Sequence, residues 1–306
     1  MQTYSNEEKR RYNKKSVKNV LSLFDGISCG QVALMRAGIT FENYYASEVN
    51  EDSISVAKKN FPNTKHIGSI VDVKAEDLPK IDMIIGGSPC QGLSLAGEHG
   101  RLEDDRSSLF YEFVRLIQEC KPKYWLLENV MTDIDTLAIM NEQLGTAPIS
   151  INSNLVSAQN RTRLYWSNFD FTQPIDQQVF LKDIVEKPLS FKNFEGTSET
   201  FFPSAIRTRK FNGKSQPCLE VRAVDIGKAN CLSKAAKDSC LTTLKPGKYG
   251  QGFSQPYRYF TEKEYCRLQT LPDDYFKDTG LGITKIRELV ADAWTVDVIK
   301  DILKHI

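Results

Sequence analysis

The sequence predicts an α/β protein: a doubly wound, mostly parallel sheet with helices on both faces, joined to a smaller, irregular β-rich domain. Two observations predict this fold class. Residues 17–171 alternate apolar runs of strand length with amphipathic stretches of helical length, which is the pattern of βαβ units. After about Thr172 the segments become short and are punctuated by Gly, Pro, Ser and Lys, until helical patterns return after about Pro256.

The predicted sheet begins with an apolar strand at 17–24, followed by a helix at 29–38 that Gly38 closes. The alternation continues with strands at 43–49, 81–87, 124–130 and 163–169 and helices at 51–60, 109–120 and 133–145. Ser107 or Ser108 is a candidate cap for the helix at 109–120. Because parallel strands place their carboxyl ends at one edge of a sheet, we expect the side chains that follow these strands to lie close together.

Two helical patterns follow the irregular segment. The stretch at 261–269 opens with the Thr-x-x-Glu of a capping box, and 296–306 is a closing amphipathic helix. We therefore divide the chain into an N-terminal arm at 1–16, a larger domain made of 17–171 and 257–306, and a smaller domain at 172–256.

The composition is that of an ordinary globular protein and argues against several functional classes. The chain has 306 residues, of which 41% are hydrophobic and 26% charged, and a formal net charge of +1. Binding to nucleic acid would therefore require the basic residues to gather on one face. There is no apolar run long enough to span a membrane and no signal-peptide core. Seven cysteines without a CxxC or CxxH pair argue against disulfides and zinc, so we expect reduced thiols, no metal and a cytoplasmic location.

The turn after the first strand, FDGISCG at 24–30, indicates a ligand site. Glycines there let the main chain approach a ligand, and N–H groups at a helix start can hold a polar or anionic group; packing alone is the alternative. Glu48 ends the second strand, where a carboxylate typically accepts ribose hydroxyls, although a solvent-exposed Glu fits that position equally well. Together the two features favour an adenosine-containing cofactor.

Cys90 lies in the turn GGSPCQG that follows the strand at 81–87. Most free cysteines are inert core residues, but a buried structural one rarely sits in such a turn at a sheet edge, where local dipoles can favour a thiolate nucleophile. Glu128 ends the next strand, so parallel pairing brings it towards Cys90. A carboxyl among apolar neighbours tends to stay protonated, which suits a proton donor; a strand-end cap or an ion pair is the alternative.

Arg161 and Arg163 precede the strand at 163–169 in the motif QNRTR and lie on the same side of an extended chain. Two guanidinium groups aimed one way can bind a carbonyl oxygen, a phosphate or a carboxylate. A structural ion pair with Glu128 is the alternative, and it is compatible with the functional interpretation.

These motifs, in this order, resemble those of the C5-cytosine DNA methyltransferases, which use S-adenosylmethionine. The residues that carry the resemblance are Phe24-Asp25-Gly26, Glu48, Pro89-Cys90-Gln91, Glu128-Asn129-Val130, Gln159-x-Arg161-x-Arg163 and the block at 258–275. The resemblance spans nearly the whole chain and is closest to the branch that holds phage enzymes and the mammalian de novo enzymes. It implies a Rossmann-like class I methyltransferase fold, with the smaller domain at 172–256 as the target-recognition domain.

The resemblance also implies a mechanism. The target cytosine is flipped out of duplex DNA, because its reacting carbons cannot be reached in the stack. Cys90 attacks C6, Glu128 contacts N3 and the exocyclic amine, and Arg163, with Arg161 beside it, holds O2. C5 takes the methyl group of S-adenosylmethionine, leaving S-adenosylhomocysteine; a base then removes the C5 proton and Cys90 leaves.

For the cofactor, the family pattern places Phe24 against the adenine, Glu48 on the ribose, Val49 and Ile70 as apolar walls and Leu109 beneath. The full set expected to bind the cofactor is Phe24, Asp25, Gly26, Ile27, Cys29, Glu48, Val49, Ser69, Ile70, Pro89, Leu109, Ala293 and Trp294.

Two positions depart from the family pattern. Ser69 stands where an Asp usually meets the adenine amine, and 291–294 reads Ala-Asp-Ala-Trp where Gly-Asn-x-Val is usual. We expect Trp294 to cover the cofactor.

DNA contacts are expected from two segments. A loop at 91–108 should close over the DNA, with Gln91 and Ser94 in contact with it. In the target-recognition domain we expect Arg207, Arg209 and Lys245 to bind DNA. The other basic residues of this domain, mostly expected on phosphates, are Lys210, Lys214, Arg222, Lys228, Lys234, Lys237 and Lys248. A solvated basic surface is the alternative for any one of them.

Other functions share part of this pattern. A tRNA cytosine-5 methyltransferase would use the same chemistry, and a catalytically silent DNA-binding paralogue would keep the fold alone. A dinucleotide-dependent oxidoreductase would not explain the Cys, Glu and Arg set. Because no reader domain or long regulatory arm is attached, we expect a monomeric restriction–modification type enzyme of a bacterium or a phage.

Overall fold

The computed structural model describes residues 15–88, 105–187, 201–211, 214–221, 227–235, 237, 239–243, 249–251 and 256–306. Several sequence predictions fall outside these residues, namely those on most of the N-terminal arm, on most of the loop at 91–108 and on Pro89, Cys90, Gln91, Ser94, Arg222, Lys245 and Lys248. Arg209 lies in a described strand, but its side chain is outside the description.

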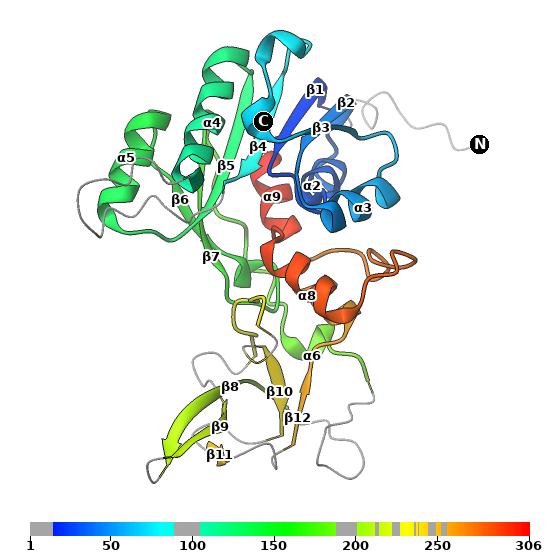
Figure 1. The fold of residues 1–306 in the computed structure, drawn as a ribbon, viewed down its shortest axis with the longest axis vertical. Helices are drawn as coiled ribbons and strands as arrows, with labels where there is room; N and C mark the ends of the chain where they lie inside the picture. Colours follow the sequence, from blue (N-terminus) through cyan, green and yellow to red (C-terminus); the bar gives the residue numbers. More distant parts are fainter. Residues whose placement is uncertain are drawn as a thin grey trace.

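A seven-stranded, mostly parallel sheet forms the larger part of the molecule (Figure 1), which confirms the predicted fold class. Its strands are β1 (Ser16–Leu23), β2 (Thr40–Ser47), β3 (Lys65–Gly68), β4 (Met83–Gly87), β5 (Tyr124–Val130), β6 (Ile149–Asn152) and β7 (Thr162–Ser167). Their order across the sheet is β3-β2-β1-β4-β5-β7-β6. The first five strands in this order pair in parallel, whereas β7 runs antiparallel to both β5 and β6. The sequence did not predict β3 or β6.

Helices cover both faces of this sheet. They are α2 (Cys29–Arg36), α3 (Glu51–Asn60), α4 (Asp105–Cys120), α5 (Ile134–Leu144), α7 (Glu262–Leu268), α8 (Ile283–Asp292) and α9 (Val296–Leu303). The predicted capping box of α7 is confirmed, because Thr261 accepts from the Glu264 N–H and Glu264 accepts from the Thr261 N–H. The predicted cap of α4 is wrong: α4 begins at Asp105, which places Ser107 and Ser108 inside the helix. The sequence also missed α8.

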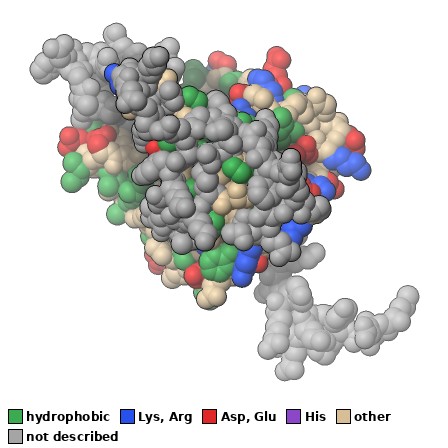
Figure 2. Space-filling model, turned by 90° about the horizontal axis from the view of Figure 1, so that it is seen from below, with side chains coloured by type: hydrophobic (Ala, Val, Ile, Leu, Met, Phe, Trp, Pro, Cys, Tyr) green, Lys and Arg blue, Asp and Glu red, His purple; other side chains and the backbone are tan. Residues whose placement is uncertain are grey.

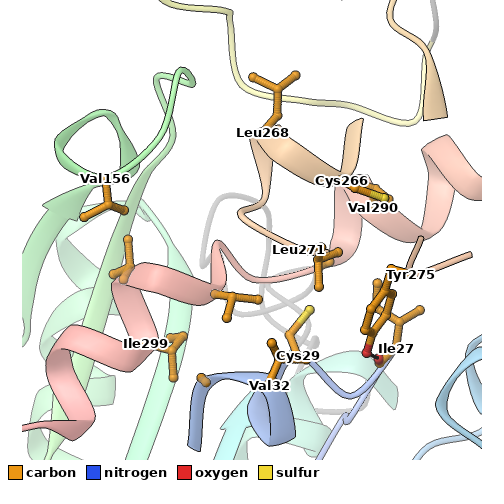
Figure 3. Packing of buried hydrophobic residues seen from close by; sticks show 14 of the residues in the cluster. Ile27, Cys29, Val32, Val156, Cys266, Leu268, Leu271, Tyr275, Val290 and Ile299 are labelled. Atoms are coloured by element: carbon orange, nitrogen blue, oxygen red, sulfur yellow. Dashed lines mark hydrogen bonds between the residues drawn. The ribbon is translucent and has the colours of Figure 1, made fainter. Parts of the chain in front are cut away.

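Two clusters of buried hydrophobic side chains lie on opposite faces of the sheet, because successive residues of a strand point to opposite faces. Met83 and Ile85 of β4 belong to one cluster and Ile84 to the other. The first cluster packs against α2, α7, α8 and α9, and the second against α4 and α5. Figure 3 shows the first cluster, in which helix α2, with Val32, packs against helix α9, with Ile299.

A five-stranded antiparallel sheet forms the smaller lobe, at the bottom of Figure 1. Its strands are β8 (Phe202–Phe211), β9 (Lys214–Val221), β10 (Cys240–Thr242), β11 (Tyr249–Gln251) and β12 (Tyr257–Tyr259), in the order β11-β9-β8-β10-β12. It includes β12, which lies just beyond the predicted boundary at Pro256. Figure 2 views the molecule from this end and shows lysine and arginine side chains near the margin of the face, with acidic side chains beside them.

A buried ion pair joins the two lobes. Arg258 of β12 donates two hydrogen bonds to the carboxylate of Glu264 in α7, at 2.6 and 2.7 Å. Glu264 is fully buried and also accepts from the main-chain N–H of Glu186, 2.8 Å away, just after the short helix α6 (Leu181–Ile184). One carboxylate therefore holds the small sheet, α7 and the segment that leads into the small sheet.

We expect Glu264→Ala to lower the free energy of unfolding by about 3–5 kcal/mol, because it leaves the half-buried guanidinium of Arg258 and two N–H groups without their acceptor. Chemical denaturation measures this change. Glu288→Ala is the matched control, since that carboxylate is exposed and its pair with Lys285 spans 3.9 Å; its effect should stay within about 0.5 kcal/mol. Equal midpoints for the two variants would contradict the role given to Glu264.

Candidate functional site

A cavity of about 500 Å³ opens at the carboxyl edge of β1, β2, β4 and β5. Its lining contains all predicted cofactor and catalytic residues that lie in the described part of the chain: Phe24, Asp25, Gly26, Ile27, Cys29, Glu48, Val49, Ser69, Ile70, Leu109, Glu128, Arg161, Arg163, Ala293 and Trp294. Glu48 and Glu128 were predicted to meet here because the strand ends of a parallel sheet lie at one edge, and the resemblance to the family implied the other residues of the cofactor set.

The turn after β1 has an unusual backbone. Phe24, Gly26 and Ser28 all adopt left-handed conformations, with φ of 57°, 56° and 62°. Such a conformation costs a non-glycine residue about 1–3 kcal/mol and tends to occur where a ligand is held. The turn bends the main chain towards the cavity immediately before α2 begins at Cys29.

Glu48 fixes this turn to the end of β2. One carboxylate oxygen accepts from the N–H of Gly26 at 2.7 Å, and the other accepts from the N–H groups of Val49 and Asn50 at 2.8 Å. A carboxylate offers about four lone-pair sites, so one remains for a hydroxyl donor in the cavity. The side chain of Val49 stands 70% exposed at the mouth.

Asp25 is a buried acid beneath the same turn. Its carboxylate accepts from the hydroxyl of Tyr44 at 2.8 Å and from the hydroxyl of Ser28. Burial is the main cause that raises the pKa of Asp25 to about 6. Burial also raises the pKa of the neighbouring Cys29 thiol to about 12, so that this thiol is not a nucleophile at neutral pH.

Glu128 lies at the other end of the cavity, and each of its oxygens has a partner. The Nε of Arg163 is 3.1 Å from Oε1, and the indole Nε1 of Trp294 donates to Oε2 at 3.1 Å. In the register of the sheet, Glu128 stands beside Gly87 of β4. A Cβ atom at position 87 would lie 2.8 Å from the indole nitrogen and 2.9 Å from Oε2, so this contact requires a glycine.

The two arginines of the QNRTR motif differ in their partners. Arg163 forms an ion pair with Glu128, which was the alternative interpretation of this motif. Arg161 is 5% exposed and donates to the carbonyl oxygens of Ala291 and Ala293, each at 3.1 Å. It directly precedes β7, and it lines the same cavity as Arg163. Arg161 thus holds the segment that carries Trp294.

A segment of the predicted recognition domain also reaches the site. Lys234 lines the cavity and pairs with Asp292 at 2.7 Å. Cys231 accepts from the guanidinium groups of Arg161 and Arg163, at 3.5 and 3.9 Å. Lys234 was expected among the residues that contact DNA phosphates, and no role was predicted for Cys231. Neither position carries a local sequence signal that indicates this site.

The prediction that Lys228 belongs to an exposed basic surface is wrong. Its side chain is buried, and the ammonium group donates to three carbonyl oxygens, those of Asn154, Ser157 and Val179, at 2.5 to 3.0 Å. The ammonium group also lies 4.9 Å from the ring centre of Phe180. Arg207 lies on β8, and its side chain is partly exposed.

Within the described residues, no helix is both long and apolar enough to cross a membrane. The same part of the chain holds no group of three or more His, Cys, Asp or Glu side chains placed to bind a metal ion.

Comparisons with known proteins bear on the family and the fold. The model of the "C-5 cytosine-specific DNA methylase" family matches residues 18–306. The chain is 29% identical over 329 residues to the type II methyltransferase M.FnuDI of Fusobacterium nucleatum, which covers 94% of this chain and 93% of that protein. It is 30% identical over 207 residues to the orphan methyltransferase M.SPRI of Bacillus phage SPR, covering 59% of this chain and 47% of that protein.

Among solved structures, the Dnmt2 methyltransferase of S. pombe superposes with a TM-score of 0.68 and 17% identity, covering 94% of this chain and 98% of that one. At this level of identity, the similarity concerns the fold.

We expect Asp25 to make stability fall as the pH rises. Its pKa lies at about 6 in the folded protein against an ordinary value of 3.8, so the folded state holds the proton more tightly between these values. Relative to Asp25→Asn, the wild type should lose about 2.5 kcal/mol of unfolding free energy between about pH 4 and pH 7. Urea denaturation of both proteins measures this. A difference between them that stays constant with pH would contradict the burial argument.

Proposed function

The chain belongs to the family of C-5 cytosine-specific DNA methylases, and from this premise we propose that it flips one cytosine out of duplex DNA and methylates it at C5. Cys90 is the nucleophile of this proposal and S-adenosylmethionine is the methyl donor. The bacterial and phage relatives support a modification enzyme that works in the cytoplasm of a bacterial or phage-infected cell.

The position of Glu128 carries the proposal. It ends β5 beside Gly87, and Cys90 follows Gly87 by three residues. Three residues of extended chain span at most about 11 Å, so the Cys90 sulfur stays within reach of a ring held at Glu128. The same cavity holds Glu48, Phe24 and the strained turn at the opposite end. One site can therefore hold a pyrimidine beside a nucleoside.

In the proposed reaction, Cys90, Glu128 and Arg163 each act on a different atom of the cytosine ring. When the Cys90 thiolate adds to C6, negative charge develops on N3 and O2 of the ring and C5 becomes nucleophilic. Glu128 contacts N3 and the exocyclic amine, and Arg163 stabilises the charge on O2. S-adenosylmethionine, when bound, supplies an electrophilic methyl group. A base then removes the C5 proton, the electrons of the C5–H bond re-form the double bond, and the thiolate leaves from C6.

The described lining fits S-adenosylmethionine. Phe24 and Ile70 provide apolar surface for the adenine, and the lone-pair site left on Glu48 suits a ribose hydroxyl. Ser69 offers a hydroxyl where the adenine amine would lie, although this hydroxyl already accepts a 3.4 Å hydrogen bond from Val71. The cavity volume of about 500 Å³ falls within the range of about 300–1,000 Å³ that is usual for small-ligand sites.

For the DNA, we propose contacts from both lobes. Gln91 and Ser94 follow Cys90 closely in the sequence. Arg207 and Arg209 are two residues apart on β8 and so share one face of the small sheet, and Lys245 completes the proposed set. These side chains would place the duplex with its target cytosine above the cavity.

Methyl transfer to unmethylated duplex DNA tests the function. We expect the purified protein to transfer tritium from S-[methyl-³H]adenosylmethionine to DNA, and bisulfite sequencing of the product to show 5-methylcytosine in one sequence context. Cys90→Ser should abolish transfer, and Glu128→Gln should slow it by about 100-fold or more. Cys120→Ser changes a thiol at the far end of α4 and should transfer at the wild-type rate. Transfer to tRNA alone, or full activity in Cys90→Ser, would contradict the proposal.

We expect Glu48→Gln to weaken binding of S-adenosylhomocysteine by about tenfold or more, because an NH2 group replaces one of the two acceptor oxygens and leaves at least one of the three main-chain N–H groups without its acceptor. Isothermal calorimetry measures the dissociation constant. Glu51→Gln, in the first turn of α3, removes a nearby exposed carboxylate and serves as the control. Unchanged affinity in Glu48→Gln would remove Glu48 from the cofactor site.

A further inference from the structure

We infer that Trp294 is a positioning residue for the reaction: its indole N–H orients the carboxylate of Glu128, while its ring forms part of the wall of the cofactor cavity. The inference rests on the proposed function and adds a connection within the site. A single side chain would link the surface that meets the cofactor to the acid that meets the target base.

The contact itself is direct. The indole nitrogen of Trp294 lies 3.1 Å from Oε2 of Glu128, and the other oxygen of Glu128 faces Arg163. With an indole N–H bonded to one oxygen and a guanidinium group paired with the other, the carboxylate is held from both sides. The close approach depends on Gly87, because any side chain there would overlap both the indole nitrogen and Oε2.

The ring of Trp294 extends from Glu128 to the first turn of α2. A Cβ atom built on Gly30 would lie 3.7 Å from Cζ3 of the indole. Trp294, Ile27, Cys29 and Glu128 all line the same cavity. The ring thus passes between the turn proposed to hold the cofactor and the carboxylate proposed to hold the base.

Hydrogen bonds on both sides of Trp294 fix its main chain. The carbonyl oxygen of Ala293 accepts from Arg161 and from the side-chain amide of Gln269, each at 3.1 Å. The hydroxyl of Thr295 donates to Gln269 at 2.7 Å and accepts from Ser153 at 2.9 Å. Because its flanking residues are held in a buried network, the indole has little freedom to release Glu128.

This arrangement prepares Glu128 for catalysis before the base arrives. A donor that is already aimed and costs no reorganisation stabilises a transition state better than one that must move. Without the indole N–H, Glu128 keeps Arg163 but can rotate about the remaining contact. The loss should therefore fall on the chemical step and leave cofactor binding largely unchanged, provided that the ring itself remains.

Trp294→Phe separates the two roles, because it keeps an aromatic ring and removes the N–H. We expect kcat for methyl transfer to fall by about tenfold or more, the effect of losing one hydrogen bond to a charged group, with KM for S-adenosylmethionine within about twofold of wild type. Trp166→Phe is the matched control, since it removes an indole donor from β7 to Asn141 of α5, in the cluster on the other face of the sheet from Trp294; its kcat should equal that of the wild type.

Two kinetic results would overturn the inference. One is a kcat for Trp294→Phe equal to that of Trp166→Phe. The other is a fall in kcat matched by an equal loss of cofactor affinity. If the wild type transfers no methyl group to DNA, that result contradicts the proposed function. The hydrogen bond between Trp294 and Glu128 is then still tested by NMR.

That measurement needs neither cofactor nor DNA. The chain has three tryptophans, so the ¹⁵N-labelled protein has three indole N–H signals in an NMR spectrum, and the signal missing in Trp294→Phe is that of Trp294. We expect Glu128→Gln to shift this signal and leave the Trp166 signal in place. An unmoved Trp294 signal would show that the indole does not donate to Glu128 in solution.

Discussion

The parallel register of β4 against β5 is the constraint on which the site depends. It sets Gly87, three residues before Cys90 in the sequence, beside Glu128. The antiparallel strand β7 then sets Arg163 opposite Val130 and brings its guanidinium to Glu128. A slip of one residue in either register would turn these side chains to the opposite face of the sheet, and the carboxylate and the guanidinium would no longer meet in the cavity.

The segment from Gln159 to Arg163 joins the chemistry to the recognition lobe. Gln159 donates to Leu268 O and accepts from the N–H of Leu232, so it bonds to both the large domain and the segment from the small one. Arg161 holds the segment before Trp294, and Lys228 binds the main chain just before this motif. These donors are buried, and a buried donor that loses its acceptor is costly. A displacement of the segment at 228–232 would therefore disturb the contacts of Gln159 and Arg161.

Local patterns in the sequence predicted the main elements, and contacts between distant segments account for what they missed. The helix at 51–60 was predicted with its observed bounds, with Pro62 marking its end in the sequence, and the structure adds Asn50 as its N-terminal cap. The strand β6 was missed, since four residues carry too little periodicity to separate a strand from a loop. Glu128 could be placed from its strand end, but its bond to Trp294, 166 residues away, appears only in the fold. Lys228 shows the same limit, because composition does not distinguish a buried lysine from one that faces a phosphate.

The central claim is that a thiolate at position 90 attacks a cytosine ring held by Glu128 and Arg163, with the methyl donor beside it. Trapping with duplex DNA that contains 5-fluorocytosine tests this most directly, because fluorine at C5 cannot be removed as a proton and the covalent complex persists. With S-adenosylmethionine present, mass spectrometry should find a protein–DNA adduct carrying one added methyl group, attached to the peptide that contains Cys90. The absence of an adduct, or its attachment to Cys231 or another cysteine, would contradict the account.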